Sequence, residues 1–387
     1  MRPRAHFIEL PGRSLDQPLT VDQVPEFCRL VPGLVHPHGR SDGMAERFGT
    51  DEPRDGSVSI VTVTYGDRWH LLSQVLKFAD ASAKVDRIVV VDNGSHPPIQ
   101  PLVKRAGFRK TTVIRSPRNL GSAGGFKLGL ETVRTYDPVW IWLLDDDNLP
   151  DPDALDTILR SAAELDETAR GKCAILAYRP GHQSDIAAGV DVSRCYPAHS
   201  SFLGFHVAEI PHKIWRRLRW GRPSGEAKIP DCVSIPYATY SGLFFHRAVL
   251  EIIGTPNEEL VLYADDTEFS YRIVQSGGSI WLLTGAPMSE LAPSWDSKAH
   301  VRSSFERWLR RGSDFHVFYG SRNRAYFDRK FWLRNTTIYR INRLTYLFLL
   351  RLFAWRYQCV ERYELFHRAI TLGEKGHLGA NDIYPLP

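Results

Sequence analysis

Four runs of apolar residues most constrain how this chain can fold. They are VSIVTVTY (58–65), RIVVVDNGS (87–95), TTVIRSP (111–117) and VWIWLLDDD (139–147). Continuous apolar runs are typical of strands buried on both faces of a parallel sheet. Helical patterns lie between them, at WHLLSQVLKFADAS (69–82) and GGFKLGLETVR (124–134). This alternation, with short connections, predicts an α/β fold with a mostly parallel, doubly wound sheet.

Polar residues follow each of the four predicted strands. They are Tyr65, Gly66 and Asp67, then Asp92, Asn93, Gly94 and Ser95, then Arg118 and Asn119, and finally Asp145, Asp146 and Asp147. Ligands of doubly wound sheets bind beyond the carboxyl ends of the strands. The sequence therefore predicts that these side chains converge on one binding crevice.

The three adjacent aspartates are the sharpest chemical signal in the crevice. Carboxylates suit a hard divalent cation such as Mg2+ or Mn2+, and alternate side chains, Asp145 and Asp147, can reach one ion while Asp146 faces elsewhere. Such an ion would bridge a diphosphate. The alternative is a solvated turn that also supplies a helix N-cap in DDDNLPDPDA (145–154).

Two further segments have the composition of binding or catalytic sites. RNLGSAGGFKLGL (118–130) places four glycines at a turn that leads into a helix, where the backbone can approach an anion. It matches neither GxGxxG after a first strand nor GxxxxGK[ST]. YADDTEFSYR (263–272) places Asp265, Asp266 and Glu268 in a first helical turn, as a general base or as complements of the helix dipole.

Seven segments occur in a fixed order along the chain. They are VTVTYGDR, VVVDNGS, NLGSAGGF, WLLDDD, SGLFFHRAVLEIIGTP, YADDTEF and FYGSRNR. Together they resemble the inverting family 2 glycosyltransferases with a GT-A fold, and among those the bacterial galactofuranosyltransferases and rhamnosyltransferases. The resemblance covers residues 57–330. It implies transfer of a sugar, with UDP or TDP as the donor nucleotide, to a hydroxyl of a glycan or polyprenyl-linked glycan in cell-surface polysaccharide synthesis.

The resemblance implies a role for each matching position. The nucleotide-sugar donor would contact Thr64, Tyr65, Asp67, Asp92, Asn93, Asn119, Gly124, Gly125 and Asp146, with Asp92 hydrogen-bonded to the base. Asp145 and Asp147 would bind Mn2+ or Mg2+. Asp266 is the favoured base for the acceptor hydroxyl, with Asp265 beside it. Glu268, Arg272 and Trp281 would be secondary positions near the acceptor.

This sequence departs from the family pattern at two points. Gly66 stands where family members often carry Asn. Many members also supply a histidine as a further metal ligand some twenty residues past the acid pair, where this chain has TGAPMSELAPSWDSKAH (284–300). Glu290, His300 or a water molecule would then complete the metal site.

The resemblance and the change in composition suggest three parts. They are an N-terminal extension (1–56), a GT-A catalytic domain (57–300) and a C-terminal helical region (301–387).

When residues 339–366 are placed on one helix, Arg340, Arg343, Arg351 and Arg362 share a sector of about 100° beside a wide apolar face. This pattern fits a membrane surface, packing on the chain's own domain, or a seam between two copies. HKIWRRLRWGR (212–222) would add a second basic, aromatic membrane contact.

Composition restricts the other possible functions. No signal peptide and no apolar stretch long enough to span a bilayer occur, which predicts a cytoplasmic protein, with peripheral attachment to the inner face of the membrane as the alternative. A sugar-nucleotide pyrophosphorylase would carry a basic, glycine-rich segment after the first strand, and TVTYGDRWH (62–70) is not one. A nucleic-acid-binding protein is disfavoured because the net charge is only +5 and no nucleic-acid-binding motif is present.

Overall fold

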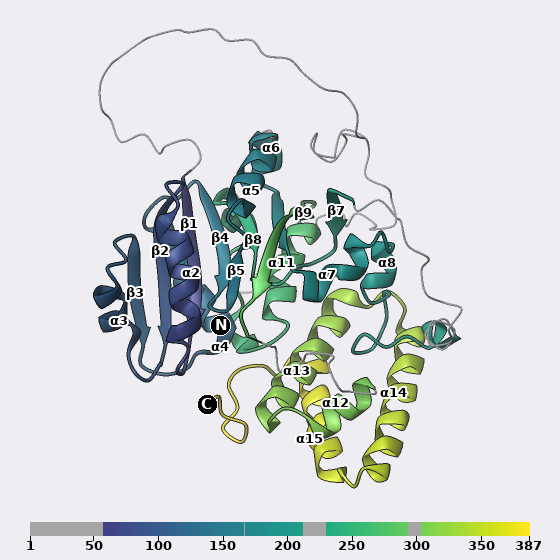
Figure 1. The fold of residues 1–387 in the computed structure, drawn as a ribbon. Helices are drawn as coiled ribbons and strands as arrows, with labels where there is room; N and C mark the ends of the chain where they lie inside the picture. Colours follow the sequence, from purple (N-terminus) through teal and green to yellow (C-terminus); the bar gives the residue numbers. More distant parts are fainter. Residues whose placement is uncertain (1–56, 166, 212–229, 293–302) are drawn as a thin grey trace, which may run out of the picture.

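A computed structural model describes residues 57–165, 167–211, 230–292 and 303–387, which form a central sheet with helices on both faces and a helical region at one end (Figure 1). The N-terminal extension, the segment 212–222 and His300 lie outside the described residues. The α/β fold class and the helical character of the C-terminal region are confirmed. The three predicted domain boundaries stay predictions.

The described sheet has nine strands in the order β3-β2-β1-β4-β8-β6-β9-β5, with β7 paired to β9. The strands are β1 (Val58–Thr64), β2 (Val85–Asn93), β3 (Thr111–Ser116), β4 (Trp140–Asp145), β5 (Asn148–Pro150), β6 (Cys173–Tyr178), β7 (Cys232–Ile235), β8 (Leu243–His246) and β9 (Ser279–Glu290). Strands β1 to β4 pair in parallel, as do β6 and β9, while β8 pairs antiparallel with both β4 and β6. The sheet is therefore mixed, with its parallel half formed by the four runs that the sequence marked.

Helices alternate with the strands in the first half and dominate the end of the chain. Those in the sheet domain are α2 (Trp69–Ala81), α3 (Ile99–Ala106), α4 (Gly121–Arg134), α5 (Ala154–Ala163), α6 (Glu167–Arg170), α7 (Pro180–Ala187), α8 (Val192–Cys195), α10 (Ala248–Ile253) and α11 (Asp265–Gln275). Those that follow are α12 (Ser304–Arg310), α13 (Asp314–Phe327), α14 (Thr336–Arg356) and α15 (Val360–Glu374), with a π-helical turn at Asp328–Trp332 and 3-10 turns at Val207–Glu209 and Glu258–Leu260.

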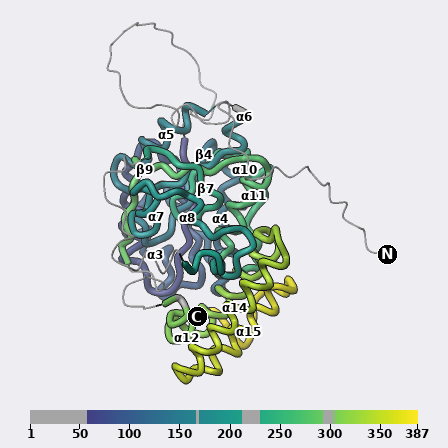
Figure 2. The backbone as a smooth tube through the Cα atoms, turned by 90° about the vertical axis from the view of Figure 1, so that its right-hand side faces the viewer, coloured from purple at the N-terminus to yellow at the C-terminus, as the bar shows by residue number. Residues whose placement is uncertain are grey.

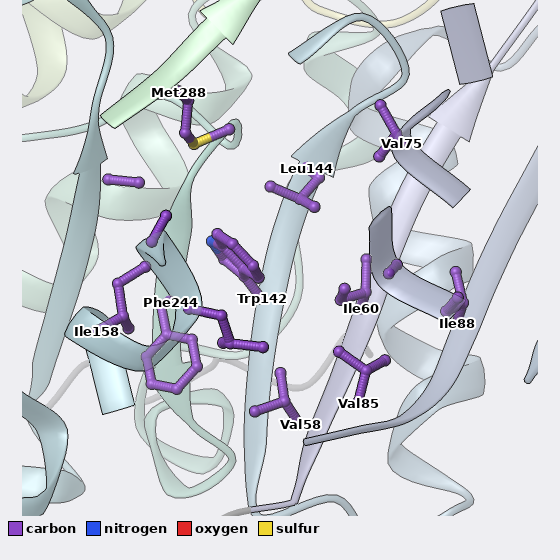
Figure 3. Packing of buried hydrophobic residues seen from close by; sticks show 14 of the residues in the cluster. Val58, Ile60, Val75, Val85, Ile88, Trp142, Leu144, Ile158, Phe244 and Met288 are labelled. Atoms are coloured by element: carbon purple, nitrogen blue, oxygen red, sulfur yellow. The ribbon is translucent and has the colours of Figure 1, made fainter. Parts of the chain in front are cut away.

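Alternate residues of each central strand pack on opposite faces of the sheet. Ile60 belongs to the core cluster that includes residues of α2, α3 and α5, and its neighbour Val61 belongs to the cluster that includes residues of α4, α10 and α11. Figure 3 shows Trp142 and Leu144 of β4 among the side chains of the first cluster. Since successive side chains of a strand point to opposite faces, both faces need an apolar partner, which explains the unbroken apolar runs.

The C-terminal helices form a region beside the sheet domain, below it in Figure 1. Helices α13 and α15 pack together, and Figure 2 shows α14 and α15 at the end of the molecule away from the sheet. The prediction of one helix over 339–366 is wrong. Gln358, between α14 and α15, has a φ of +55°, which ends the helix. Arg362 therefore lies on α15, where it is paired with Asp314.

None of the described helices combines the length and the apolar character needed to span a bilayer.

Candidate active site

A cavity of about 480 Å3 lies at the carboxyl ends of the parallel strands, where the sequence predicted it. It is lined by Val63, Tyr65, Arg68, Asn93, Asn119, Gly121, Ser122, Phe126, Asp145, Asp146, Asp147, Asn148, Arg179, His182, Leu262, Tyr263, Glu290, Ala292, Phe315, His316, Leu386 and Pro387. Strand ends, the loop before α11, helix α13 and the C-terminal segment thus all contribute walls. The crevice is enclosed partly by the helical region.

The three aspartates take three different environments. Asp146 is 4% exposed and accepts hydrogen bonds from Thr64 Oγ1 at 2.6 Å and Arg68 Nε at 2.9 Å. Asp147 accepts from Arg68 Nη2 at 2.5 Å and from Asn148 Nδ2 at 2.7 Å. The carboxylate of Asp145 has no hydrogen bond or ion pair among the described residues. Asp146 therefore anchors the turn through Thr64 and Arg68 and also lines the cavity.

Burial and nearby charges together set the pKa of Asp145. Burial, opposed by the charge of Arg179 and assisted by the charges of Asp147, Asp146 and Asp266, raises the pKa of Asp145 to about 7. An uncompensated carboxylate beside a second one in a polar cavity fits a divalent cation, which would stabilise the ionised form of both. No group of three or more His, Cys, Asp or Glu side chains within the described residues is already arranged as a metal site, so a cation would need further oxygen ligands.

Glu290 lies on the same cavity wall as the aspartates. Residues 289 and 290 end β9, which pairs antiparallel with β5, so that Glu290 is in register with Asn148. The carboxylate of Glu290 is bonded to the imidazole of His182 and lies 3.8 Å from Arg179 Nη1. This placement keeps Glu290 available as a ligand, although in this structure its Oε1 is held by His182.

The acid pair begins helix α11. Asp265 is 2% exposed and accepts a hydrogen bond from Ser122 Oγ at 2.7 Å. Burial, with the charge of Asp266 adding to it, raises the pKa of Asp265 to about 8. Asp266 is half-buried; its Oδ1 accepts from the Thr267 amide at 2.6 Å, and burial raises its pKa while the charges of Arg179 and Arg324 lower it. Neither acid is among the side chains that line the cavity, although Ser122, which is bonded to Asp265, does line it. The charge of Asp266 also raises the pKa of Asp145, so the two carboxyls are near enough to interact.

Residues predicted to bind the nucleotide fall into two groups. Tyr65, Asn93 and Asn119 line the cavity. Asn93 is 2% exposed and accepts from the Leu120 amide at 2.8 Å while its Nδ2 donates to Asn119 Oδ1 at 3.0 Å, so these two amides form one network. Thr64 is fully buried beneath Asp146, and Asp67 is exposed outside the lining.

The placement of Asp92 goes against the predicted bond to the base. Asp92 is fully buried, accepts from the backbone amides of Ser95 and Ile99 at 2.8 and 3.1 Å, and is paired with Arg115 Nη1 at 2.7 Å. Its oxygens are therefore already bonded within the protein. Asp92 stabilises the turn that leads into α3, with its charge near the helix N-terminus.

The glycine-rich segment acts through packing and not as a loop around a ligand. The predicted helix start at Gly124 is wrong, because α4 begins at Gly121. A Cβ on Gly124 would lie 2.7 Å from Leu120 Cβ, and one on Gly125 would lie 2.6 Å from Val63 Cγ1. These two glycines let the helix approach its neighbours closely and do not line the cavity. Gly121 does line it, at a φ of +74° and with Val261 O only 2.0 Å from a Cβ added there.

Gly66 has a φ of +63° with open space around its added Cβ. Glycine and asparagine both tolerate this left-handed region, so the exchange of Asn for Gly at this position preserves the turn.

The three predicted acceptor positions lie outside the cavity lining. Arg272 is paired with Glu268 at 3.3 Å and donates to the carbonyl oxygens of Ile253 and Thr255, so it holds α10 to α11. Trp281 is 4% exposed within β9 and its Nε1 donates to Ser279 Oγ at 2.8 Å. Each side chain is thus engaged by its own neighbours, and a role at the acceptor is not supported by these contacts.

Several cavity residues were not singled out from the sequence. Arg179 directly follows β6, so the rule applied to the first four strand ends would have found it. Arg68 and His182 belong to the first turns after a strand and can be recognised in the same way. By contrast, Tyr263, Phe315, His316, Leu386 and Pro387 come from distant segments that only the fold brings together.

Residues 59–170 match the family model described as Glycosyl transferase family 2. They form a family 2 glycosyltransferase domain. Galactofuranosyltransferase GlfT1 of Mycolicibacterium smegmatis is 29% identical over 222 residues, covering 57% of this chain and 66% of the relative. GlfT1 of Mycobacterium tuberculosis (strain H37Rv) is 29% identical over 229 residues, with the same two coverages. The chain thus spans slightly less than two thirds of the length of these curated relatives.

Solved structures also resemble the chain. GalNAc-T7 with UDP, GalNAc and Mn2+ is 14% identical, with a TM-score of 0.46 over 86% of this chain and 58% of that one. The mannosyltransferase PcManGT from Pyrobaculum calidifontis, in complex with GDP-Man and Mn2+, is 16% identical, with a TM-score of 0.40 over 82% of this chain and 86% of that one.

Proposed function

We propose that the protein is a metal-dependent, inverting glycosyltransferase that moves galactofuranose or rhamnose from a UDP- or TDP-linked donor to a hydroxyl of a glycan. The observation that carries the proposal is the cavity at the strand ends, which is lined by the carboxylate of Asp145 and by Ser122, whose hydroxyl is bonded to Asp265 of the acid pair. The relatives named galactofuranosyltransferases favour galactofuranose. The family 2 domain favours transfer over a pyrophosphorylase activity.

The chemistry is a single displacement. The acceptor oxygen attacks the anomeric carbon, the bond from that carbon to the diphosphate oxygen breaks, and its electron pair leaves with the nucleoside diphosphate. Asp266 receives the proton of the acceptor hydroxyl, and the raised pKa of this half-buried carboxyl makes it a stronger base than an exposed aspartate. Asp265, beside it and hydrogen-bonded to Ser122, keeps the start of α11 in place.

The metal site would be shared between protein and donor. Asp145 and Asp147 would hold Mn2+ or Mg2+, with Glu290 as a third candidate on the same wall. A divalent cation supplies positive charge to the departing diphosphate. Asp147 is paired with Arg68 in this structure, so its carboxylate would exchange that partner for the cation, while Arg68 would keep its bonds to Asp146.

The exposed face of helix α14 supports the proposal that the acceptor lies at a membrane. Its large apolar side chains Ile338, Ile341, Leu344, Phe348, Leu352 and Trp355 are 37%, 48%, 65%, 62%, 47% and 76% exposed. At 100° per residue they share a sector of about 120°, with Arg340 and Arg351 along one edge and Arg356 along the other. All four charged residues of α14 are arginines. An apolar stripe with basic edges fits a bilayer surface containing anionic lipid, and the acceptor would then be a lipid-linked glycan.

A thermal-shift panel tests the proposed activity. UDP, TDP and their sugar derivatives, each with and without Mn2+, are expected to raise the melting temperature, and the effect should be larger with the metal. Asp266→Asn should abolish sugar transfer while leaving nucleotide binding in place. If no nucleoside diphosphate stabilises the protein, the proposal is wrong; if Asp266→Asn loses binding as well as transfer, the base is another residue.

A further inference from the structure

The loop before the acid pair has an unusual backbone. Val261, Tyr263 and Ala264 have φ angles of +66°, +68° and +57°. Residues with a side chain rarely adopt this left-handed region, and they persist there only when surrounding contacts hold them. Ala264 is the residue directly before α11, and its carbonyl accepts from the Glu268 amide at 3.0 Å. The loop conformation therefore decides where Asp265 and Asp266 lie.

Two buried side chains of α13 hold this loop. Asn323 is fully buried, and its Nδ2 donates to the carbonyl oxygens of Leu260, Leu262 and Tyr263 at 2.6, 2.8 and 2.9 Å. Arg322 is 2% exposed, and its Nη2 lies 3.3 and 3.2 Å from the carbonyl oxygens of Glu259 and Leu260. Arg322 Nε also donates to Asn323 Oδ1 at 2.8 Å, which turns the amide nitrogen toward the loop.

The opposite side of the loop is fixed by α4. The Ala123 amide donates to the Val261 carbonyl at 3.1 Å, and only a glycine at position 121 leaves room for that carbonyl. The loop is thus held between two helices that are far apart in the sequence. Its outward side chains, Leu262 and Tyr263, line the donor cavity.

We propose that Arg322 and Asn323 are positioning residues for catalysis, which hold the left-handed loop and so fix the position of the acid pair at the start of α11. Neither residue lines the cavity, so they act through the loop carbonyls and not on the substrate. This assigns a purpose to the FYGSRNR segment, which lies about 55 residues beyond the acid pair. The kinetic part of this inference rests on the proposed glycosyltransferase activity, whereas its structural part does not.

Asn323→Asp tests the structural part. The change keeps the shape of the side chain but replaces the donor nitrogen with an oxygen that faces carbonyl oxygens. Ser321→Ala is the matched control, because Ser321 is equally buried on α13 and its Oγ donates only to carbonyl oxygens of its own helix. In hydrogen–deuterium exchange, we expect peptides spanning residues 258–268 of Asn323→Asp to exchange at least about tenfold faster than in the wild type, while peptides of β2 are unchanged. Unchanged exchange in the loop overturns the inference whatever the activity of the protein.

Kinetics test the catalytic consequence. In Asn323→Asp, kcat for sugar transfer should fall by about 100-fold, while the Kd for UDP with Mn2+ should change by less than about threefold, because a displaced base affects the reaction more than donor binding. Ser321→Ala should match the wild type in both. A kcat within twofold of the wild type overturns the positioning role, as does an equal loss of kcat and UDP affinity. If the wild type transfers no sugar at all, the proposed function fails, and the exchange experiment still decides whether Asn323 holds the loop.

Discussion

In most proteins charged side chains lie at the surface and large apolar ones lie inside. The carboxyl ends of the parallel strands and the outer face of α14 both depart from this distribution. At the sheet, carboxylates are drawn into the protein, and Asp145 lacks a bonded partner among the described residues. On α14, large apolar side chains face outward, with Trp355 76% exposed. Both arrangements cost stability in water, since buried charge and exposed apolar area are each unfavourable. These two exceptions underlie our proposals that a cation with a diphosphate binds at the sheet and that a lipid surface covers the outer face of α14.

Removing the unpaired charge should have the largest effect on function. We expect Asp145→Asn to lower sugar transfer by about 100-fold or more, because the metal loses a ligand. The same change should raise the melting temperature at pH 8 by about 2–4 °C, because a desolvated carboxylate is removed. Asp156→Asn, at an exposed pair with Lys84, should change neither quantity. A less stable Asp145→Asn protein would contradict the description of Asp145 as an uncompensated charge.

Breaking the pair behind Asp145 should have the opposite effect on stability. Arg68→Gln leaves Asp146, whose side chain is 6% exposed, without its guanidinium partner. We expect the free energy of unfolding to fall by about 2 kcal/mol, as is typical when a hydrogen bond to a buried charge is lost. Urea denaturation measures this. Arg134→Gln, which breaks an exposed pair with Glu251, is the control and should cost less than about 1 kcal/mol; equal losses would mean that Asp146 does not depend on Arg68.

The face of α14 is tested by flotation with lipid vesicles. The wild type should bind vesicles containing phosphatidylglycerol, and Phe348→Ser with Trp355→Ser should reduce binding by about tenfold, because exposed apolar area drives insertion into the interface. Ile252→Ser on α10 is a matched control, since Ile252 is 47% exposed and lies on another helix. Binding that is unaffected by the double change would contradict the membrane proposal. Loss of a dimer in light scattering would show that the partner is a second copy.

The smallest expected effect is a change in how stability depends on pH. Asp265 has a folded-state pKa of about 8, above that of an unfolded aspartate. Between about pH 4 and pH 8 the folded protein therefore binds more protons at this site, and the free energy of unfolding falls as pH rises. Between pH 5 and pH 8, the melting temperature of Asp265→Asn should fall less than that of the wild type. Asp191→Asn, at an exposed group whose pKa is lowered by Ser193, should show no such flattening.

The parallel half of the sheet could be predicted from the sequence alone, together with the edge at which a ligand of such a sheet would bind. The runs at β1, β2 and β4 had to be buried on both faces, while β3 is a partly exposed edge strand, and parallel strands direct their carboxyl ends to one edge. Asp145, Asp147 and the acid pair could therefore be located without coordinates. Asp145 and Asp147 line the cavity, whereas Asp265 and Asp266 lie outside its lining, and the roles of all four stay predictions.

Which of the polar side chains at the strand ends are already bonded within the protein could be seen only in the structure. Asp92 follows a strand as Asp145 does, yet its oxygens are bonded to Ser95, Ile99 and Arg115. Gly124 and Gly125 proved to be packing contacts, and the helix expected over 339–366 ends before Gln358. The roles of Arg322 and Asn323 depend on contacts across about 60 residues of sequence. The physical reason is that strand and helix patterns are local, whereas the partner of a buried polar group is chosen by the packing of distant segments.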